Sequence, residues 1–156
     1  MFLIVGLGNP GKKYENTRHN IGSRMIEKLE PLNLENVILT KPTTFMNDSG
    51  KAVKLLIKRY PRNSNNLIIV HDDIDLPLGK IKIVKNRGAA GHKGVESVIK
   101  ELKTKDFNRI RIGICPETGK PKNVENFVLQ NFKKEEEKIL KEVIEETIKE
   151  VIKLTK

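Results

Sequence analysis

Cysteine, tryptophan and long apolar runs are scarce or absent in this 156-residue chain. The single cysteine, Cys115, excludes an internal disulfide framework and favours a reducing compartment. No apolar run approaches the roughly 20 residues that a membrane-spanning helix needs. A strand-like segment follows Met1 at once, without a charged leader. We therefore expect a cytoplasmic protein in which residues 1–156 form one domain, since a chain of this length can bury a sufficient core.

Acidic residues are too few to balance the basic ones, and the formal net charge is +10 at pH 7. Residues 133–156 hold seven lysines and seven glutamates, so the surplus lies in residues 1–132. Such a surplus indicates a polyanionic partner, with nucleic acid as the first candidate and an anionic membrane surface as the second. A thermophilic or AT-rich origin would produce a similar composition.

Short apolar runs alternate with segments of helical periodicity. We expect strands at residues 2–5, 37–40, 67–71, 81–84 and 110–114. Helical spacing occurs around residues 21–29, 53–60, 95–102 and 127–132, and residues 133–156 have the pattern of a long amphipathic helix. This alternation predicts the α/β class: a single-domain three-layer sandwich with a twisted, mixed, mostly parallel sheet flanked by helices. Ligands of such sheets bind beyond the carboxyl ends of the strands.

The first strand ends in Gly6, Gly8 and Gly11, which spell G-x-G-x-x-G. In a dinucleotide-binding fold the helix begins inside this glycine loop, so that its N–H groups face the pyrophosphate. Here Pro10 follows, and helical spacing starts only near residue 21. The glycines are better explained by a tight turn that presents Asn9 and Tyr14.

His19 lies near the start of the first predicted helix, with Thr17 or Asn16 as its cap. A helix N-terminus disfavours additional positive charge, so an imidazole there stays neutral and can accept a proton as a general base. A capping or surface histidine is the alternative explanation.

A second group of polar residues, His71, Asp72, Asp73 and Asp75, follows a buried strand. These side chains can hold a divalent cation, orient a histidine, or cap the turn before Pro77. The first of these options corresponds to a metal-dependent phosphoesterase.

Two further loops carry residues suited to substrate contacts. Phe45 and Asn47 combine a stacking surface with an amide, although Phe45 and Met46 equally suit a core plug. The glycine-rich loop before the third helix carries His92 and Lys93 and suits phosphate binding or closure over a substrate. A plain flexible connector is the alternative for that loop.

Taken together, these stretches resemble the bacterial peptidyl-tRNA hydrolase family. The resemblance rests on six segments in the family's order: IVGLGNPGKKYENTRHNIG, KPTTFMNDSGKAV, VHDDIDLPLGKIKI, GAAGHKGVESVI, FNRIRIGI and NFVLQNF. It implies hydrolysis of the ester between a peptide and the terminal ribose of tRNA. It also implies that neither a metal nor another cofactor is needed, that the partner is peptidyl-tRNA rather than a membrane or an obligate protein, and that the protein is a monomer.

The resemblance also assigns roles to particular residues. His19 corresponds to the general base, Asp72 to the carboxylate that holds it, and Asn9 to the residue that senses the blocked amino end. The positions expected to contact the substrate or tRNA are Tyr14, Phe45, Asn47, His92, Lys93 and Arg111, the last of these at the tRNA 5′ phosphate. A non-catalytic RNA-binding module that keeps these residues as contacts is the rival hypothesis.

The sequence departs from the family pattern at two places. Lys93 occupies a position where the family often has Asn, and lysine can donate a hydrogen bond but cannot accept one. The segment between residues 30 and 37 is short, where the family usually has an extra pair of strands. The resemblance therefore implies a trimmed member with a smaller sheet.

Overall fold

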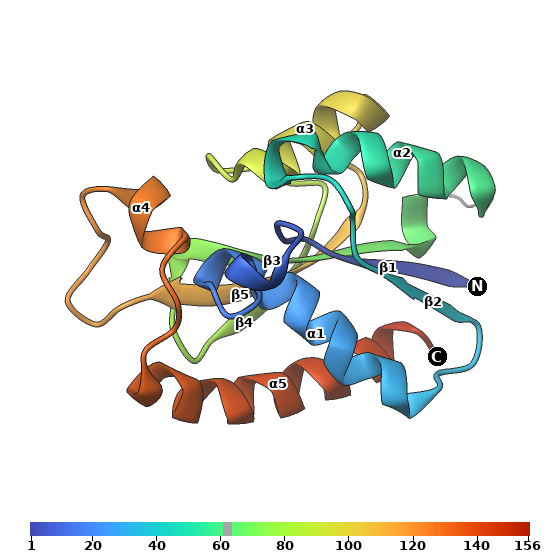
Figure 1. Ribbon diagram of the computed structural model, residues 1–156. Helices are drawn as coiled ribbons and strands as arrows, with labels where there is room; N and C mark the ends of the chain where they lie inside the picture. Colours follow the sequence, from blue (N-terminus) through green and yellow to red (C-terminus); the bar gives the residue numbers. More distant parts are fainter. Residues whose placement is uncertain (61–63) are drawn as a thin grey trace.

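The computed structural model describes residues 1–60 and 64–156, which form a five-stranded sheet with helices on both faces (Figure 1). The strands are β1 (Phe2–Gly6), β2 (Val37–Thr40), β3 (Leu67–Pro77), β4 (Ile81–Lys85) and β5 (Asn108–Cys115). They lie in the order β2-β1-β3-β5-β4. The first four in this order are parallel, and β4 runs antiparallel to β5 at the edge. The predicted α/β class and mixed, mostly parallel sheet are confirmed.

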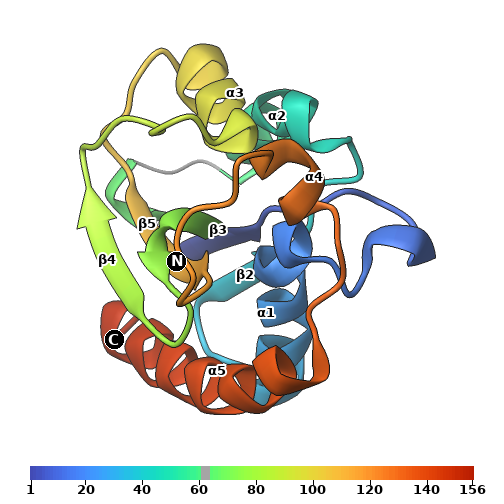
Figure 2. The ribbon, with the colours of Figure 1, turned by 90° about the vertical axis from the view of Figure 1, so that its left-hand side faces the viewer.

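Helices form the two outer layers. The helices are α1 (Ile21–Leu29), α2 (Ser49–Arg59), α3 (Lys93–Leu102), α4 (Val124–Val128) and α5 (Lys134–Leu154). Short 3-10 turns precede or follow several of them, namely η1 (Lys12–Tyr14), η2 (Arg18–Asn20), η3 (Glu30–Leu32), η4 (Met46–Asp48) and η5 (Ser64–Asn66). Helices α2 and α3 cover one face of the sheet, α1 and α5 cover the other, and α4 lies beyond the carboxyl ends of the parallel strands (Figures 1 and 2). None of the helices over the described residues has the length and apolar character required for a bilayer span.

The alternation of side chains along the central strands divides the core in two. Ile4, with its neighbours on β3, faces α1 and α5, whereas Leu3 and Val5 face α2 and α3. All three side chains are fully buried. A strand that is buried on both faces must be apolar at every position, which explains the continuous apolar runs of β1, β3 and β5.

The close approach of α1 to the sheet depends on glycine. A Cβ added at Gly22 would lie 2.2 Å from the carbonyl oxygen of Val70, and one added at Gly6 would lie 2.1 Å from the carbonyl oxygen of Gly22. Any side chain at either position would therefore push α1 off the strands. This contact brings η2, the turn just before α1, to the carboxyl end of β3.

Two predicted boundaries were wrong. The third strand does not end at residue 71 but continues to Pro77, because β5 keeps pairing with it through Asp73 and again, after a register shift, at Pro77. The short helix predicted at residues 127–132 spans Val124–Val128 instead, because the side chain of Asn123 accepts a hydrogen bond from the backbone N–H of Asn126 and caps the helix earlier.

Candidate active site

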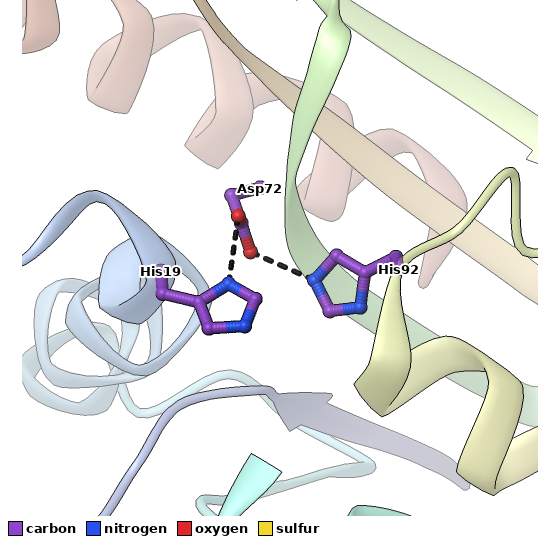
Figure 3. Close-up of side chains that lie close together, drawn as sticks. All are labelled: His19, Asp72 and His92. Atoms are coloured by element: carbon purple, nitrogen blue, oxygen red, sulfur yellow. Dashed lines mark hydrogen bonds and ion pairs between the residues drawn. The ribbon is translucent and has the colours of Figure 1, made fainter. Parts of the chain in front are cut away.

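Asp72 is the centre of a polar cluster at the carboxyl end of the central strand β3. Its side chain is 2% exposed, and its two oxygens have different partners. Oδ2 lies 2.8 Å from Nδ1 of His19, and Oδ1 lies 2.8 Å from Nε2 of His92 (Figure 3). The carboxylate is thus held between two imidazoles that come from positions 53 residues before it and 20 residues after it.

His19 is held in η2 by its neighbour Arg18, whose side chain is buried. The Arg18 guanidinium donates to the carbonyl of Phe127 at 3.0 Å and to Oε1 of Glu136 at 2.7 Å, and it stacks 3.8 Å from the centroid of the Phe127 ring. The backbone N–H of Arg18 also donates to the carbonyl of Gln130 at 3.0 Å. These contacts fasten the segment that carries His19 to the chain between α4 and α5. The predicted cap at Thr17 or Asn16 was wrong: the residue before α1 is Asn20, and the Thr17 hydroxyl donates to a turn carbonyl instead.

His92 begins α3 and acts as its cap. Its Nδ1 accepts a hydrogen bond from the backbone N–H of Val95 at 3.2 Å, while its Nε2 donates to Asp72. The ring centroid lies 5.0 Å from that of His19. The start of the helix therefore fixes the orientation of the ring that meets the carboxylate.

Burial and charge have opposite effects on the pKa values at this centre. Burial raises the pKa of Asp72, but the charges of His19 and His92 and their hydrogen bonds outweigh it, so that this pKa lies far below its ordinary value. Burial lowers the pKa of His19, but the charge of Asp72 and its hydrogen bond outweigh burial and raise that pKa above its ordinary value. Asp72 is therefore a carboxylate at neutral pH, and His19 is a stronger base than a free imidazole.

Hydrogen-bond partners assign the protons of the chain's three histidines. A carboxylate and a carbonyl only accept, whereas a backbone N–H and a guanidinium only donate. His92 thus uses both ring nitrogens, and His71 does the same by donating from Nδ1 to the Asp72 carbonyl at 2.7 Å and accepting at Nε2 from Arg109 at 3.3 Å. His19 donates from Nδ1 to Asp72, and among the described residues no group occupies its Nε2. Its Nε2 lone pair is available to a substrate or a water.

A cavity of about 310 Å³ opens beside this centre. It lies between the loop before α3 and the short helix α4. Both polar and apolar residues line it, namely His19, His71, Asp72, Asp73, Ile74, Ala89, Ala90, Gly91, His92, Lys93, Lys120, Val124, Glu125 and Val128. A neutral imidazole beside apolar side chains suits a substrate that has both a polar reacting group and an apolar portion.

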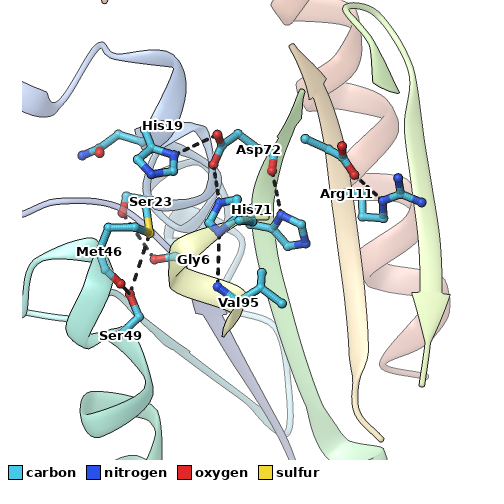
Figure 4. A network of polar contacts seen from close by, with 12 residues as sticks. Gly6, His19, Ser23, Met46, Ser49, His71, Asp72, Val95 and Arg111 are labelled. Atoms are coloured by element: carbon cyan, nitrogen blue, oxygen red, sulfur yellow. Dashed lines mark hydrogen bonds and ion pairs between the residues drawn. The ribbon is translucent and has the colours of Figure 1, made fainter. Parts of the chain in front are cut away.

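Asn9 lies in the glycine turn, and three hydrogen bonds hold it, including one from the Asn20 amide to its backbone carbonyl at 2.9 Å. Its backbone N–H donates to Oδ1 of Asn20 at 2.9 Å, and its own Oδ1 accepts from the backbone N–H of Met46 at 2.7 Å. Met46 is buried and its carbonyl accepts from Ser49, so η4 is fixed against the core (Figure 4). Asn9 thereby links the turn after β1 to the turn that carries Asn47.

The remaining predicted contact residues are spread around the centre. The rings of Tyr14 and Phe45 meet edge to face with centroids 6.2 Å apart, and Phe45 is 57% exposed, so it is not the core plug that the sequence also allowed. Asn47 is exposed and lines a second cavity, which it shares with Lys93. Asn9 lines a third depression rather than the cavity at His19.

Arg111 lies on β5 and is paired with Asp73 through its Nε (Figure 4). The two side chains line a small basic cavity of about 210 Å³, together with Arg87 and Arg109. Asp73 also lines the cavity at His19, so the two cavities adjoin each other. Lys93, at the start of α3, has a largely exposed side chain whose Nζ lies 3.6 Å from Glu96.

The acidic cluster that the sequence suggested as a metal site does not converge. Asp73 pairs with Arg111, and Asp75 pairs with Lys120 at 3.1 Å, so both carboxylates are matched by cations. The group that has metal-ligand spacing is instead His19, Asp72 and His92, whose ligand atoms lie within 4.8 Å of one another. A cation there would have to displace the two protons that join Asp72 to the imidazoles.

Sequence reasoning missed three contacts at this centre. It assigned His92 to substrate binding and did not expect its bond to Asp72, it gave no role to Arg109, and it considered His71 only as a candidate cation ligand. Only the register of the sheet brings these residues together. His71 on β3 lies directly opposite Arg111 on β5, and Arg109 is two residues before Arg111 on the same strand.

Comparison with known proteins agrees with this geometry. The family model described as peptidyl-tRNA hydrolase matches residues 3–33 and 29–156. This chain belongs to the peptidyl-tRNA hydrolase family. The peptidyl-tRNA hydrolase of Shouchella clausii (strain KSM-K16) is 43% identical over 171 residues, covering 97% of this chain and 91% of that protein. The one from Aquifex aeolicus (strain VF5) is 42% identical, covering 94% of this chain and 86% of that protein.

Solved structures show the same fold. The crystal structure of peptidyl-tRNA hydrolase from Acinetobacter baumannii superposes with a TM-score of 0.89 at 31% identity and covers 99% of this chain. This chain covers 88% of that one, so it is somewhat shorter than the known family members. The family model matches in two segments that overlap at residues 29–33, beside the segment where the sequence predicts the shortening.

Proposed function

We propose that this protein hydrolyses the ester bond between a peptide, or an N-blocked aminoacyl group, and the 3′-terminal ribose of tRNA. The supporting observation is the set of hydrogen-bond partners of the three histidine rings, which leaves Nε2 of His19 as the ring nitrogen that can accept a proton. That atom belongs to the side chain held by Asp72 beside the cavity of about 310 Å³. Membership of the peptidyl-tRNA hydrolase family supplies the substrate class.

The reaction requires one base and no covalent intermediate. Nε2 of His19 removes a proton from a water, whose oxygen attacks the ester carbonyl carbon to form a tetrahedral intermediate. The ester C–O bond then breaks, and the imidazolium returns its proton to the departing ribose oxygen. Asp72 holds the Nδ1–H tautomer throughout and stabilises the positive charge that develops on the ring. A general base of this kind contributes about 10²- to 10⁴-fold to the rate.

Two amides complete the proposed centre. The Oδ1 atom of Asn9 is engaged by Met46, which leaves its Nδ2 to donate to a carbonyl of the bound peptide. We assign to this contact the preference for a blocked amino end. Asn47 lies one residue beyond Met46, and we assign its amide to the developing oxyanion.

The tRNA end is assigned to aromatic and basic groups around the cavity. Tyr14 and Phe45 offer a partly exposed edge-to-face pair on which a base or ribose can stack. Arg111 in the basic cavity suits a terminal phosphate, and Lys93 adds a cation between two cavities. The basic surplus of the chain suits the remaining phosphates, with binding that weakens as salt rises.

The deciding experiment is turnover of an N-blocked aminoacyl-tRNA by the purified protein with EDTA present. We expect release of free tRNA and of the blocked amino acid, and the same activity after dialysis against chelator. His19→Ala should abolish turnover, while its affinity for tRNA in filter binding stays within about twofold of the wild type, because His19 contributes chemistry rather than phosphate contacts. Salt-sensitive binding without cleavage would support the RNA-binding module instead. Hydrolysis of a nucleotide that requires added Mg²⁺ or Mn²⁺ would support the metal-dependent phosphoesterase instead.

We also infer, from the membership of the peptidyl-tRNA hydrolase family, that the active unit is a monomer in the cytoplasm. Size-exclusion chromatography with light scattering at assay concentration tests the oligomeric state. A stable dimer would overturn this assignment without affecting the proposed reaction.

A further inference from the structure

The loop of residues 86–92 carries His92 from β4 to Asp72, and its backbone has an unfavourable shape. Asn86 and Ala90 have φ angles of 57° and 48°, in the left-handed region that L side chains rarely adopt. A loop with this backbone keeps its conformation only where contacts from outside hold it. The position of the His92 ring therefore depends on what fastens the loop.

Arg109 fastens the first half of that loop. This residue lies on β5, is 3% exposed, and donates from Nη2 to the carbonyls of Arg87 at 3.0 Å and Gly88 at 2.8 Å. The guanidinium thus crosses from the sheet to two consecutive peptide groups of the loop. No other residue in the described part of the chain donates a side-chain hydrogen bond to those two carbonyls.

The same guanidinium is joined to the catalytic strand through His71. Nη1 of Arg109 donates to Nε2 of His71 at 3.3 Å, and Nδ1 of His71 donates to the carbonyl of Asp72 at 2.7 Å. The His71 ring also packs edge-on against that of His92, with centroids 4.8 Å apart. The chain of contacts therefore runs from the loop carbonyls through Arg109 and His71 to the backbone of Asp72.

The hydrogen-bond partners of His71 and Arg109 determine the protonation states of these two side chains. His71 must be neutral to accept from a guanidinium, and burial lowers its pKa well below the ordinary value. Burial likewise lowers the pKa of Arg109, and its Nε has no hydrogen-bond partner. The carboxylate nearest to Arg109 on this surface, Asp73, is bonded to Arg111 instead. A buried cation held by neutral acceptors contributes little to the stability of the fold. The role of Arg109 is therefore to fix the positions of the loop and of His71.

We propose that Arg109, linked through His71, is a positioning residue of the catalytic centre: it holds the loop of residues 86–92 so that His92 donates to Asp72. His92 in turn shares the charge of Asp72 with His19. This inference rests on the proposed hydrolysis, and it assigns Arg109 a different role from Arg111, two residues along the same strand. Both side chains line the basic cavity, but Arg111 is assigned to the substrate phosphate, whereas Arg109 acts through the loop.

The test compares Arg109→Lys, His92→Asn and the double variant with the wild type, using an N-blocked aminoacyl-tRNA. The oxygen of Asn at position 92 can take the place of Nδ1 and cap α3. The shorter side chain has no donor at the place of Nε2, so the hydrogen bond to Asp72 is lost. We expect each single variant to lower kcat by roughly tenfold, the loss associated with one hydrogen bond to a charged group. KM and its salt dependence should stay within twofold of the wild type. Because both variants act on the same contact, the double variant should be no slower than His92→Asn.

The pH profile supplies a readout that general structural damage would not produce. Without the bond from His92, the full charge of Asp72 acts on His19, the ionisable group that faces it from η2. The pKa of His19 then rises further, and the acidic limb of kcat/KM moves to higher pH in both single variants. Hydrogen exchange at residues 86–92 should be faster in Arg109→Lys and unchanged in Arg59→Lys, a matched change at an exposed arginine on α2.

Several outcomes would overturn the proposal. If Arg109→Lys raises KM and reduces the salt dependence while kcat stays unchanged, Arg109 is a phosphate contact. Multiplicative losses in the double variant would show that Arg109 does not act through His92. If Arg109→Lys does not fold, His71→Asn replaces it. The amide N–H of the introduced Asn can take the place of the His71 Nδ1 donor to the Asp72 carbonyl, but the shorter side chain has no acceptor at the place of Nε2, where Arg109 donates. An acidic limb that stays at the wild-type pH in this variant also refutes the proposal. An inactive wild type would refute the proposed function, which is a separate result.

Discussion

Replacing Asp72 by Asn tests the centre most directly, because the carboxylate accepts from two imidazoles and an amide can accept from only one of them. If the amide oxygen faces His19, its NH₂ group faces the N–H of His92, and one contact becomes a repulsion of two donors. If the amide is reversed, His19 must move its proton to Nε2 and ceases to be a base. In either orientation neither contact is charge-assisted any longer, and the charge that raises the pKa of His19 is lost.

The size of the effect follows from these losses. A hydrogen bond to a charged group contributes about 1.5–3 kcal/mol, which corresponds to roughly 10- to 150-fold in rate. Imposing the wrong imidazole tautomer in a serine protease triad costs about 10⁴-fold. We therefore expect kcat of Asp72→Asn to fall by about 10²- to 10⁴-fold. Burial alone lowers the pKa of His19, so the acidic limb of kcat/KM should move to lower pH once the opposing charge is removed.

The assay is steady-state hydrolysis of an N-blocked aminoacyl-tRNA between pH 5 and pH 9, with thermal melting to show that the variant is folded. Asp106→Asn is the matched control, because Asp106 is 53% exposed and lies 3.7 Å from Lys85, so its loss should not change the profile. A variant that keeps kcat within threefold, or an acidic limb at the wild-type pH, would refute the role assigned to Asp72.

Three further predictions concern stability and binding. Arg18→Met removes the cation that pairs with the buried Glu136, and it should lower the free energy of unfolding, measured in urea, by about 3–5 kcal/mol. Arg24→Met, at the partly exposed pair with Glu137, should lower it by at most about 1 kcal/mol. Equal losses would contradict the burial argument. Gly22→Ala places a Cβ 2.2 Å from the Val70 carbonyl and should destabilise by at least about 1–3 kcal/mol, while Gly88→Ala, with no atom within 4 Å, should leave the melting temperature unchanged. Arg111→Gln should raise KM and reduce the slope of log affinity against log salt by about 1; an unchanged slope would remove Arg111 from the tRNA contacts.

Helical and strand periodicity were sufficient to predict most of the fold. The apolar runs at β1, β3 and β5 are buried on both faces because these strands are central, and the segment at β2 was predicted with the observed bounds. The errors fell where tertiary contacts override local pattern. β3 continues through Asp72 and Asp73 because β5 pairs with it there, and α4 begins at Val124 because Asn123 caps it.

The candidate site was only partly predictable. His19 and Asp72 were identified as base and partner through the family motif, and their 2.8 Å contact bears out the pairing. The second imidazole on Asp72 was not predicted, because the loop of residues 86–92 has a conformation that its sequence does not encode locally. The positive φ of Ala90, for example, would not be expected for alanine.

The sequence alone determined the layers and the chemical groups available, since periodicity of 2 and 3.6 residues and the charge surplus are local properties of the chain. Tertiary structure decided which groups meet. The direction of each side chain depends on strand register and helix entry, so that Asp72 faces two imidazoles while Asp73, one residue later, faces Arg111. It also decided which histidine keeps a ring nitrogen without a partner among the described residues, because the other nitrogen of His19 is bonded to Asp72, 53 residues along the chain.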